Sequence, residues 1–200
     1  MHQVAEMLAS KGHEVTVFAL NTRKHFVEEE KIPASLRKKF RYITVPVDTS
    51  VTVAGAFINL FRPKVSYNVI RFFDKSATRR LTALLRSERF DAVVFESVFM
   101  LPYLDIVRKE STAKCIIRPH NVEHQIWKRL ADASGNPFKR AYLRLLAKRL
   151  SDYENDSFGK TDAIIPITAV DEAMMAECAP QLPRLVLPVG IDVAKIGRAS

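Results

Sequence analysis

Short apolar runs separated by polar turns recur along the chain. Most of them are rich in Val and Ile and are continuous rather than alternating, which is the pattern of parallel strands covered on both faces. The expected strands are residues 15–20, 42–47, 92–95, 115–117, 163–167 and 185–189. Segments with helical spacing lie between them, so the predicted repeating unit is strand, helix, strand.

Apolar residues spaced for one helical face mark the expected helices. Residues 1–10 form one that ends at Lys11-Gly12, a typical carboxyl-terminal stop, and residues 74–86 form another. Further helices are expected to begin at Asn121 and after Thr168, which starts a weak capping box. The apolar faces comprise Val4, Met7 and Leu8; Ala77, Leu81, Leu84 and Leu85; Ile126, Trp127 and Leu130; and Ala173, Met174 and Met175.

The longest expected helix spans residues 137–156. Its apolar stripe comprises Phe138, Ala141, Tyr142, Leu145, Leu146, Leu150 and Tyr153. Basic side chains occupy much of the remaining surface: Lys139, Arg140, Arg144, Lys148 and Arg149. Residues 51–68 fit no period, because Gly55, Pro63 and several aromatic residues interrupt the pattern. We expect a loop with a short helical piece there, a candidate for a mobile flap beside a site.

Alternating strands and helices predict an α/β domain with a Rossmann-like, doubly wound parallel sheet. Domains of this kind usually begin with the strand at the centre of the sheet, whereas this chain begins in a helix. We therefore expect a sheet that lacks its first strand. The domain is expected to cover residues 1–192, and residues 193–200 to begin a linker or tail.

Composition narrows the class of protein. The chain has 200 residues, of which 48% are hydrophobic and 26% charged, as in a soluble domain of ordinary size. No apolar run approaches the roughly 18 residues that a membrane-spanning helix needs, and the amino terminus has no signal pattern, so we expect a cytoplasmic protein. The formal net charge of +9 favours an anionic partner such as nucleic acid, a phosphorylated substrate or an acidic lipid surface.

Several chemical signatures are absent from the sequence. The six glycines form neither G-x-G-x-x-G nor G-x-x-x-x-G-K-[ST], so the chain alone is not expected to bind a nucleotide. There is no G-x-S-x-G elbow, no H-E-x-x-H and no EF-hand loop. The two cysteines, Cys115 and Cys178, form no C-x-x-C pair, and we expect both to be reduced and buried.

The densest polar segment is Arg118-Pro119-His120-Asn121-Val122-Glu123-His124, directly after an expected strand. Ligands of α/β sheets bind at the carboxyl ends of strands, so this segment is expected to line a crevice. A bland interpretation is helix capping, in which Asn121 accepts backbone N–H groups and Glu123 complements the helix dipole. A more specific interpretation is that His120 is a neutral group that hydrogen-bonds a sugar or phosphate, and that Arg118 adds positive charge to the site.

A metal site is the third interpretation of this segment. His120, Glu123 and His124 match H-x-x-E-H, the inverted zinc-protease motif, which needs both histidines on one helical face. A cap at Asn121 would leave His120 outside the helix and only His124 in its first turn, and no third ligand is evident. We therefore predict no bound metal.

The ordered series of segments resembles a known family. It consists of Gly12-His13-Glu14-Val15-Thr16-Val17, Phe90-Asp91-Ala92-Val93-Val94-Phe95-Glu96, Arg118-Pro119-His120-Asn121-Val122-Glu123-His124, Tyr153-Glu154, Asp162-Ala163-Ile164-Ile165-Pro166-Ile167-Thr168 and Pro188-Val189-Gly190-Ile191-Asp192. This order is similar to the amino-terminal half of a retaining GT-B glycosyltransferase of the family-4 type, over nearly the whole chain. Such enzymes have two Rossmann-like domains, of which the first chiefly binds the acceptor and the second holds the nucleotide sugar.

The resemblance implies roles for individual residues. His120 would be the cleft histidine that contacts the donor sugar near the reacting centre, and Gly190 and Asp192 would mark the entry to the interdomain hinge. Glu96 and Ser97 fall where acceptor contacts are usual. The complete set of expected substrate-binding residues is Glu96, Ser97, Arg118, Asn121, His124 and Thr168.

The implied activity is hexosyl transfer, with retained configuration, from a nucleotide sugar to a glycan or lipid-linked acceptor, as in polysaccharide biosynthesis. Fixed donors and cations around the departing diphosphate would supply most of the stabilisation, without a resident cofactor, since the nucleotide sugar is a substrate. The family's first strand with its glycine-containing loop has no counterpart before Met1, and its second domain has none after Ser200. This chain alone is therefore expected to be inactive.

Two kinds of partner remain to be considered. The simplest interpretation of the basic helix is that its charged face is solvated. It is also a candidate for peripheral docking on the acidic inner face of the cell membrane, through Lys139, Arg140, Arg144, Lys148 and Arg149. Nucleic acid is disfavoured, because aromatic residues are not interleaved with the basic ones. An unfilled sheet edge could also be covered by a second copy, which makes a homodimer an expectation.

Three alternative functions stay open. A sugar-nucleotide epimerase shares the GT-B architecture but is less similar in the segment from Arg118 to His124. A non-catalytic sugar- or phosphate-binding module is favoured by the absent phosphate loop. A metal hydrolase requires that the chain bind zinc.

Overall fold

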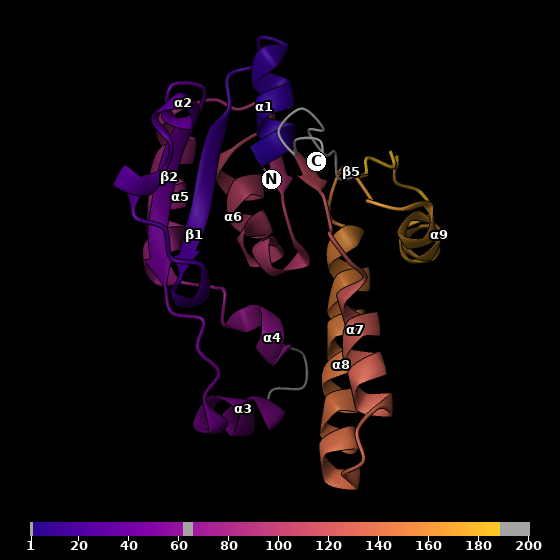
Figure 1. Ribbon diagram of the computed structural model, residues 1–200. Helices are drawn as coiled ribbons and strands as arrows, with labels where there is room; N and C mark the ends of the chain where they lie inside the picture. Colours follow the sequence, from indigo (N-terminus) through magenta and orange to yellow (C-terminus); the bar gives the residue numbers. More distant parts are fainter. Residues whose placement is uncertain (1, 62–65, 189–200) are drawn as a thin grey trace, which may run out of the picture.

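Parallel strands and covering helices make up the protein, as the alternation of apolar segments predicts (Figure 1). The computed structural model describes residues 2–61 and 66–188. Strand β1 (Thr16–Thr22) pairs in parallel with β2 (Arg41–Val47), and β3 (Ala92–Phe95), β4 (Lys114–Ile117) and β5 (Ala163–Ile164) form a second parallel sheet in that order. The α/β class with a parallel sheet is thus confirmed.

Helices cover both faces of the β1–β2 sheet. Successive side chains of a strand point to opposite faces, and those of β1 belong to two different clusters. Val17 packs with Ala5 of α1 (His2–Ser10), whereas Phe18 and Leu20 pack against the core that includes Leu81 of α5 (Lys75–Ser87). Coverage on both faces is the doubly wound arrangement that the continuous apolar strands predict.

The strands divide into two sheets between β1 and β3. In the part of the chain that the structure describes, no ladder joins these two strands, and a shared core of side chains from β2, α5 and β3 holds the sheets together. The last expected strand is only partly formed: the Leu185 N–H donates to the Ile164 carbonyl at 3.2 Å and the Leu187 N–H to the Pro166 carbonyl at 2.9 Å. This segment extends the second sheet beside β5, and its residue 189 lies outside the described residues.

Further helices connect the strands and flank the two sheets. The short 3-10 segments are η1 (Arg23–His25), η2 (Glu29–Lys31) and η3 (Val98–Tyr103). The α-helices are α2 (Ala34–Arg37), α3 (Val53–Leu60), α4 (Tyr67–Ile70), α6 (Leu104–Glu110), α7 (Glu123–Asp132), α8 (Pro137–Phe158) and α9 (Ala169–Cys178). Helices α7 and α8 pack along each other and extend beyond the sheets as a hairpin (Figure 1).

Most of the helix ends follow the capping chemistry of the sequence. Helix α1 ends at Ser10, and Gly12 follows it with a φ of 88°, a conformation that glycine adopts without strain. The Asp74 carboxylate accepts from the Ala77 N–H at 3.0 Å at the start of α5, and the Thr168 hydroxyl accepts from the Asp171 N–H at 3.0 Å at the start of α9. All four apolar residues assigned to the buried face of α5 are buried.

Residues 51–68 contain more helix than we expected. Helix α3 begins after Thr52, whose hydroxyl accepts from the Gly55 N–H at 3.0 Å, and α4 follows at Tyr67. A Cβ atom on Gly55 would lie 2.8 Å from the Tyr67 hydroxyl oxygen, so this close packing requires glycine. Tyr67 therefore packs α4 against the start of α3, where its hydroxyl also accepts from the Thr52 N–H at 3.0 Å. A loop was the wrong prediction for most of the described part of this segment.

The buried face of α8 is rotated from the predicted stripe. Leu146 and Leu150 are buried as expected, but Leu143 and Ala147 join them, while Phe138 is 86% exposed. Helix α7 packs against α8 and selects this face, which the sequence of α8 alone does not determine.

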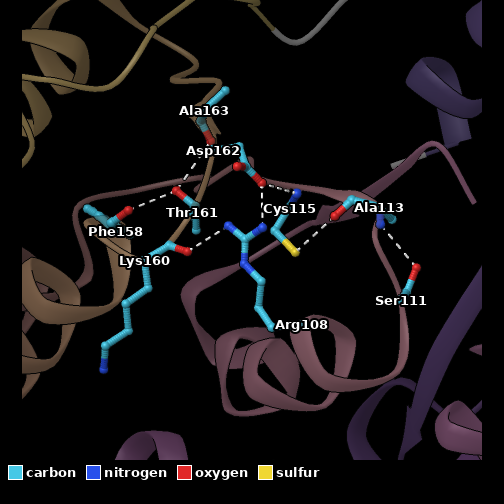
Figure 2. Close-up of polar contacts among 9 residues, drawn as sticks. All are labelled: Arg108, Ser111, Ala113, Cys115, Phe158, Lys160, Thr161, Asp162 and Ala163. Carbon is cyan, nitrogen blue, oxygen red and sulfur yellow. Dashed lines mark hydrogen bonds and ion pairs between the residues drawn. The ribbon is translucent and has the colours of Figure 1, made fainter.

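The amino ends of β4 and β5 are joined by a polar network (Figure 2). The Asp162 carboxylate accepts from the Cys115 N–H at 2.6 Å and lies 2.8 Å from Nη1 of Arg108. The backbone hydrogen bond first, and the guanidinium second, lower the pKa of Asp162. Burial raises the pKa of the Cys115 thiol, which is free and buried as predicted, whereas the free Cys178 is only partly buried.

Candidate functional site

The best-connected predicted site residues lie at the carboxyl ends of β3 and β4. Phe95 and Ile117 are register partners in these parallel strands, and the Arg118 N–H donates to the Phe95 carbonyl at 2.8 Å. Glu96 and Arg118, which follow the two strands directly, are therefore brought side by side. This edge of an open α/β sheet is where ligands bind.

Glu96 joins Arg118 and His120 into one cluster. Its Oε2 atom lies 3.0 Å from Nη1 of Arg118 and 2.8 Å from Nε2 of His120. The side chains are 3% exposed for Arg118, 17% for Glu96 and 43% for His120. Exposure thus increases along the cluster, from a buried guanidinium to an imidazole that solvent or a ligand can reach.

Arg118 retains an unused donor inside the protein. Its Nε atom is one of three buried polar side-chain atoms without a hydrogen-bond partner in the described part of the chain. Leaving a buried donor unsatisfied costs about 1–3 kcal/mol, so such atoms are uncommon in folded proteins. The cluster at this strand edge is therefore not optimised for stability alone.

A second cluster surrounds the start of α7. The carboxylate of Glu154, on α8, accepts from the Glu123 N–H at 2.9 Å and the His124 N–H at 3.3 Å. It also lies 2.5 Å from Nδ1 of His124 and is itself 1% exposed. Glu154 therefore caps α7 from another helix, a role that its position 30 residues away in the sequence did not reveal.

The predicted cap at Asn121 is wrong. Helix α7 begins at Glu123 after Val122, whose apolar side chain has no hydrogen-bond acceptor. The Glu154 carboxylate accepts the first N–H groups of the helix instead. The Asn121 side chain instead hydrogen-bonds Glu123. Burial raises the pKa of Glu123, the bond from Asn121 lowers it, and the neighbouring charge of Glu154 raises it further. The ordered series includes the Tyr153-Glu154 pair, but nothing in that pair indicates that Glu154 caps α7.

The two histidines of the polar segment have different surroundings. His120 lies outside α7 and His124 in its first turn, as predicted. His120 faces Glu96, whereas His124 faces Glu154 through Nδ1 and Gln125 through Nε2, at 3.1 Å. They therefore do not converge on one point, and the described residues include no group of three or more His, Cys, Asp or Glu that could hold a metal ion.

The hydroxyl residues of the predicted site make local caps. Ser97 Oγ accepts from the Phe99 N–H at 3.3 Å at the start of η3. Thr168 caps α9, and its hydroxyl donates to Asp171 at 2.7 Å. Contact of either residue with a substrate stays a prediction. Gly190, Asp192 and the tail from residue 193 lie outside the described residues.

The basic set on α8 is divided by burial. Arg149 is buried and its Nη1 donates to the Asn59 carbonyl of α3 at 2.8 Å, so its predicted contact with a membrane is wrong in this conformation. Lys139 is exposed, and the other three basic residues pair locally: Arg140 with the Ser134 carbonyl, Arg144 with Asp132 and Lys148 with Asp152. In the described ranges no helix is long and apolar enough to cross a bilayer.

Comparison with known proteins identifies the family. No curated protein sequence matches the chain. A solved structure described as LpCGTa in complex with UDP is similar at a TM-score of 0.49 and 15% identity, over 98% of this chain and 52% of that one. This chain thus spans about half the length of that protein. The profile of Glycosyltransferase Family 4 matches residues 1–195, nearly the entire sequence. The chain belongs to Glycosyltransferase Family 4.

Proposed function

We propose that this domain is the acceptor-side half of a two-domain glycosyltransferase that transfers a hexosyl group from a nucleotide sugar to a glycan or lipid-linked acceptor, with retention of configuration. Membership of the family supports the reaction class. The observation that carries the proposal is the cluster of Glu96, Arg118 and His120 at the carboxyl ends of neighbouring parallel strands. It sets a partly exposed imidazole, held by an ion pair, where an α/β sheet binds its ligand.

His120 orients the sugar in this proposal rather than acting as a strong base. The transition state of glycosyl transfer carries positive charge on the sugar ring and negative charge on the departing diphosphate. A hydrogen bond between a fixed imidazole and the sugar holds the ring in the reactive geometry, and such positioning lowers the barrier because reacting atoms need not be ordered during the reaction. Cations and N–H groups of the complete enzyme stabilise the diphosphate.

The test is the turnover of the full-length protein carrying His120→Ala. Release of nucleoside diphosphate from a panel of UDP-, GDP-, dTDP- and ADP-sugars identifies the donor, and NMR of the product gives its anomeric configuration. We expect the replacement to lower kcat by on the order of 100-fold or more. His13→Ala, at an exposed histidine on the loop before β1, is the matched control and should leave kcat unchanged.

Two results would contradict the proposal. Turnover that survives His120→Ala removes the proposed role of His120, and a product of inverted configuration rules out the retaining mechanism. A full-length protein that binds nucleotide sugar but turns over none of the panel would point to a binding module. Conversion of the nucleotide sugar without any acceptor would point to an epimerase.

We further infer that the enzyme works in the cytoplasm at an acidic membrane surface. Lys139, Arg140, Arg144 and Lys148 lie on the outer part of the α7–α8 hairpin, with Asp132 and Asp152 as their near carboxylates. Basic side chains gathered on one projecting element suit anionic headgroups, and each contributes about 1 kcal/mol near such a surface. Co-flotation with vesicles should need acidic lipid and be lost on adding salt.

A charge-reversed pair tests the membrane contact. Lys139→Glu/Lys148→Glu should abolish co-flotation with acidic vesicles. Lys109→Glu/Lys114→Glu makes the same change in charge near the amino end of β4 and should leave it unchanged. Equal binding by both variants would show that the hairpin does not make the contact.

A further inference from the structure

His120 and His124 differ in how many of their ring nitrogens the protein occupies. Both nitrogens of His124 have partners, Glu154 on one side and Gln125 on the other, and its side chain is 18% exposed. Within residues 2–61 and 66–188, His120 is held through Nε2 alone, at 2.8 Å from Glu96, and 43% of its side chain is exposed. Protein groups thus occupy both ring nitrogens of His124, whereas among the described residues Nδ1 of His120 is left for a ligand.

The ion pair determines which nitrogen of His120 carries the proton. A carboxylate oxygen only accepts hydrogen bonds, so the short contact with Oε2 of Glu96 requires a proton on Nε2. The same oxygen accepts from Nη1 of Arg118, a guanidinium that is nearly fully buried and always charged. Arg118 therefore fixes Glu96 in place, and Glu96 fixes both the plane and the tautomer of the imidazole.

We propose that Arg118 and Glu96 are positioning residues that hold His120 as its Nε2–H tautomer, so that Nδ1 accepts a hydrogen bond from a hydroxyl group of the sugar substrate. The inference rests on the proposed function for the identity of the ligand, but the tautomer itself does not. In this tautomer Nδ1 presents a lone pair, which pairs with an O–H donor. A fully ionised diphosphate has no such donor, so His120 selects the sugar and not the phosphates.

This role differs from the contact that the sequence implied for Glu96. Both hydrogen bonds of Oε2 are made to the protein, so this oxygen acts on the substrate through His120. A second carboxyl whose charge interacts with this imidazole is that of Glu123, the first residue of α7. Arg118 holds Glu96 in this position, because among the ion pairs described its buried guanidinium contacts no other carboxylate.

The direct test is the tautomer of His120 in the full-length protein. Long-range ¹H–¹⁵N correlation spectra of ¹⁵N-histidine-labelled protein distinguish Nε2–H from Nδ1–H, and His120→Ala assigns the signal. We expect wild type to show one Nε2–H tautomer with a slowly exchanging proton. Glu96→Ala should lose that slow exchange and mix the tautomers, whereas Glu96→Gln should keep the protein folded and preserve Nε2–H in part, since its amide oxygen still accepts.

Control variants separate positioning from general loss of structure. Glu154→Gln perturbs the neighbouring carboxylate and should leave the His120 signal unchanged. In the turnover assay Glu96→Ala should lower kcat on the order of tenfold or more per folded molecule, with partial rescue by glutamine, while Glu14→Ala on the loop before β1 changes nothing. A loss that only tracked the folded fraction would indicate a purely structural role.

The outcomes separate this inference from the proposed function. A ring protonated at both nitrogens or an Nδ1–H tautomer in wild type, or a tautomer that Glu96→Ala leaves unaltered, would overturn the positioning role even if His120→Ala abolished turnover. Conversely, an Nε2–H tautomer in a protein that transfers no sugar would leave the positioning intact and remove the proposed reaction.

Discussion

The two ends of the β3–β4–β5 sheet each carry an arginine–carboxylate pair, yet the pairs differ in their surroundings. At the amino ends, Asp162 and Arg108 are 28% and 39% exposed, and Asp162 also receives the Cys115 N–H (Figure 2). At the carboxyl ends, Arg118 and Glu96 are more deeply buried, and Arg118 keeps an unpaired Nε. The first pair joins α6 to the start of β5, and its Asp162 also binds β4. The second pair fixes the position of His120, which is partly exposed.

The comparison shows how to separate a stabilising contact from a functional one. The amino-end network links backbone to side chain and uses its hydrogen-bonding capacity within the protein. The carboxyl-end cluster instead contains a buried donor without a partner, Nε of Arg118, and the partly exposed ring of His120. Both lie at the end of the sheet where ligands of this fold bind. Local contacts that are costly for stability are expected where a site is organised for a substrate.

The largest effect on stability should come from breaking the buried pair. Glu96→Ala leaves the Arg118 guanidinium without its carboxylate in a nearly dry environment, and such a loss costs about 3–5 kcal/mol. Urea unfolding at neutral pH measures it. A loss under about 1 kcal/mol would show that water reaches Arg118 and that the two pairs are equivalent.

Removing both buried charges sharpens the contrast. Glu96→Met/Arg118→Met replaces the ion pair by apolar side chains of similar length, so we expect it to recover most of the stability that Glu96→Ala loses. Its turnover should stay low, because nothing holds His120. Recovered turnover in the folded double variant would contradict the proposal that Glu96 and Arg118 position His120 for the reaction.

A smaller effect is expected at the amino ends. Asp162→Asn keeps an oxygen for the Cys115 N–H but removes the charge facing Arg108, and charge-assisted hydrogen bonds contribute about 1.5–3 kcal/mol before solvent screening, which this partly exposed pair reduces to about 1 kcal/mol. Turnover per folded molecule should be unchanged. A fall in kcat at constant folded fraction would show that this network also serves the reaction.

The same pair gives a pH dependence with a definite sign. The pKa of Asp162 is lowered in the folded protein, so folding favours its ionised form. Its contribution to stability is therefore complete above the ordinary carboxyl range and is lost as the pH falls through and below it. The difference in unfolding free energy between wild type and Asp162→Asn should shrink from pH 6 to pH 3; a difference that widens would have the wrong sign.

The smallest expected effect is that of Arg108→Ala. Its guanidinium is partly exposed, and removing it leaves Asp162 with the Cys115 N–H and with access to water. We expect a loss of about 0.5–1 kcal/mol, below that of Asp162→Asn or equal to it. A thermal unfolding scan of the two variants checks this order, which would be reversed if the guanidinium bond to the Lys160 carbonyl dominated.

Local features of the sequence predicted much of the fold because they depend on neighbours in the chain. The period of α5, the stop at Gly12 and the cap at Thr168 each involve residues within one or two turns, and each is confirmed. The buried face of α8 and the cap of α7 were predicted wrongly, because each depends on the packing of one helix against the other.

The candidate site was predictable as a set of residues but not as an arrangement. Strand ends placed Glu96, Arg118 and His120 near one edge, since parallel strands bring their carboxyl ends together. The pairing of Arg118 with Glu96 requires that β3 and β4 be neighbours in this register. The pattern of apolar residues does not predict the order of strands in a sheet. The sequence placed Glu154 only in the ordered series of segments. Its capping of α7 arises from the packing of α7 against α8, which brings its carboxylate to the Glu123 N–H.

One measurement compares the two ends of the sheet directly: kcat per folded molecule for His120→Ala and Asp162→Asn in the full-length protein, with unfolding free energies determined on the same samples. The account predicts that His120→Ala lowers kcat on the order of 100-fold or more and barely changes stability, while Asp162→Asn lowers stability and leaves kcat intact. Full turnover in His120→Ala would contradict the claim that the carboxyl-end cluster is the functional site.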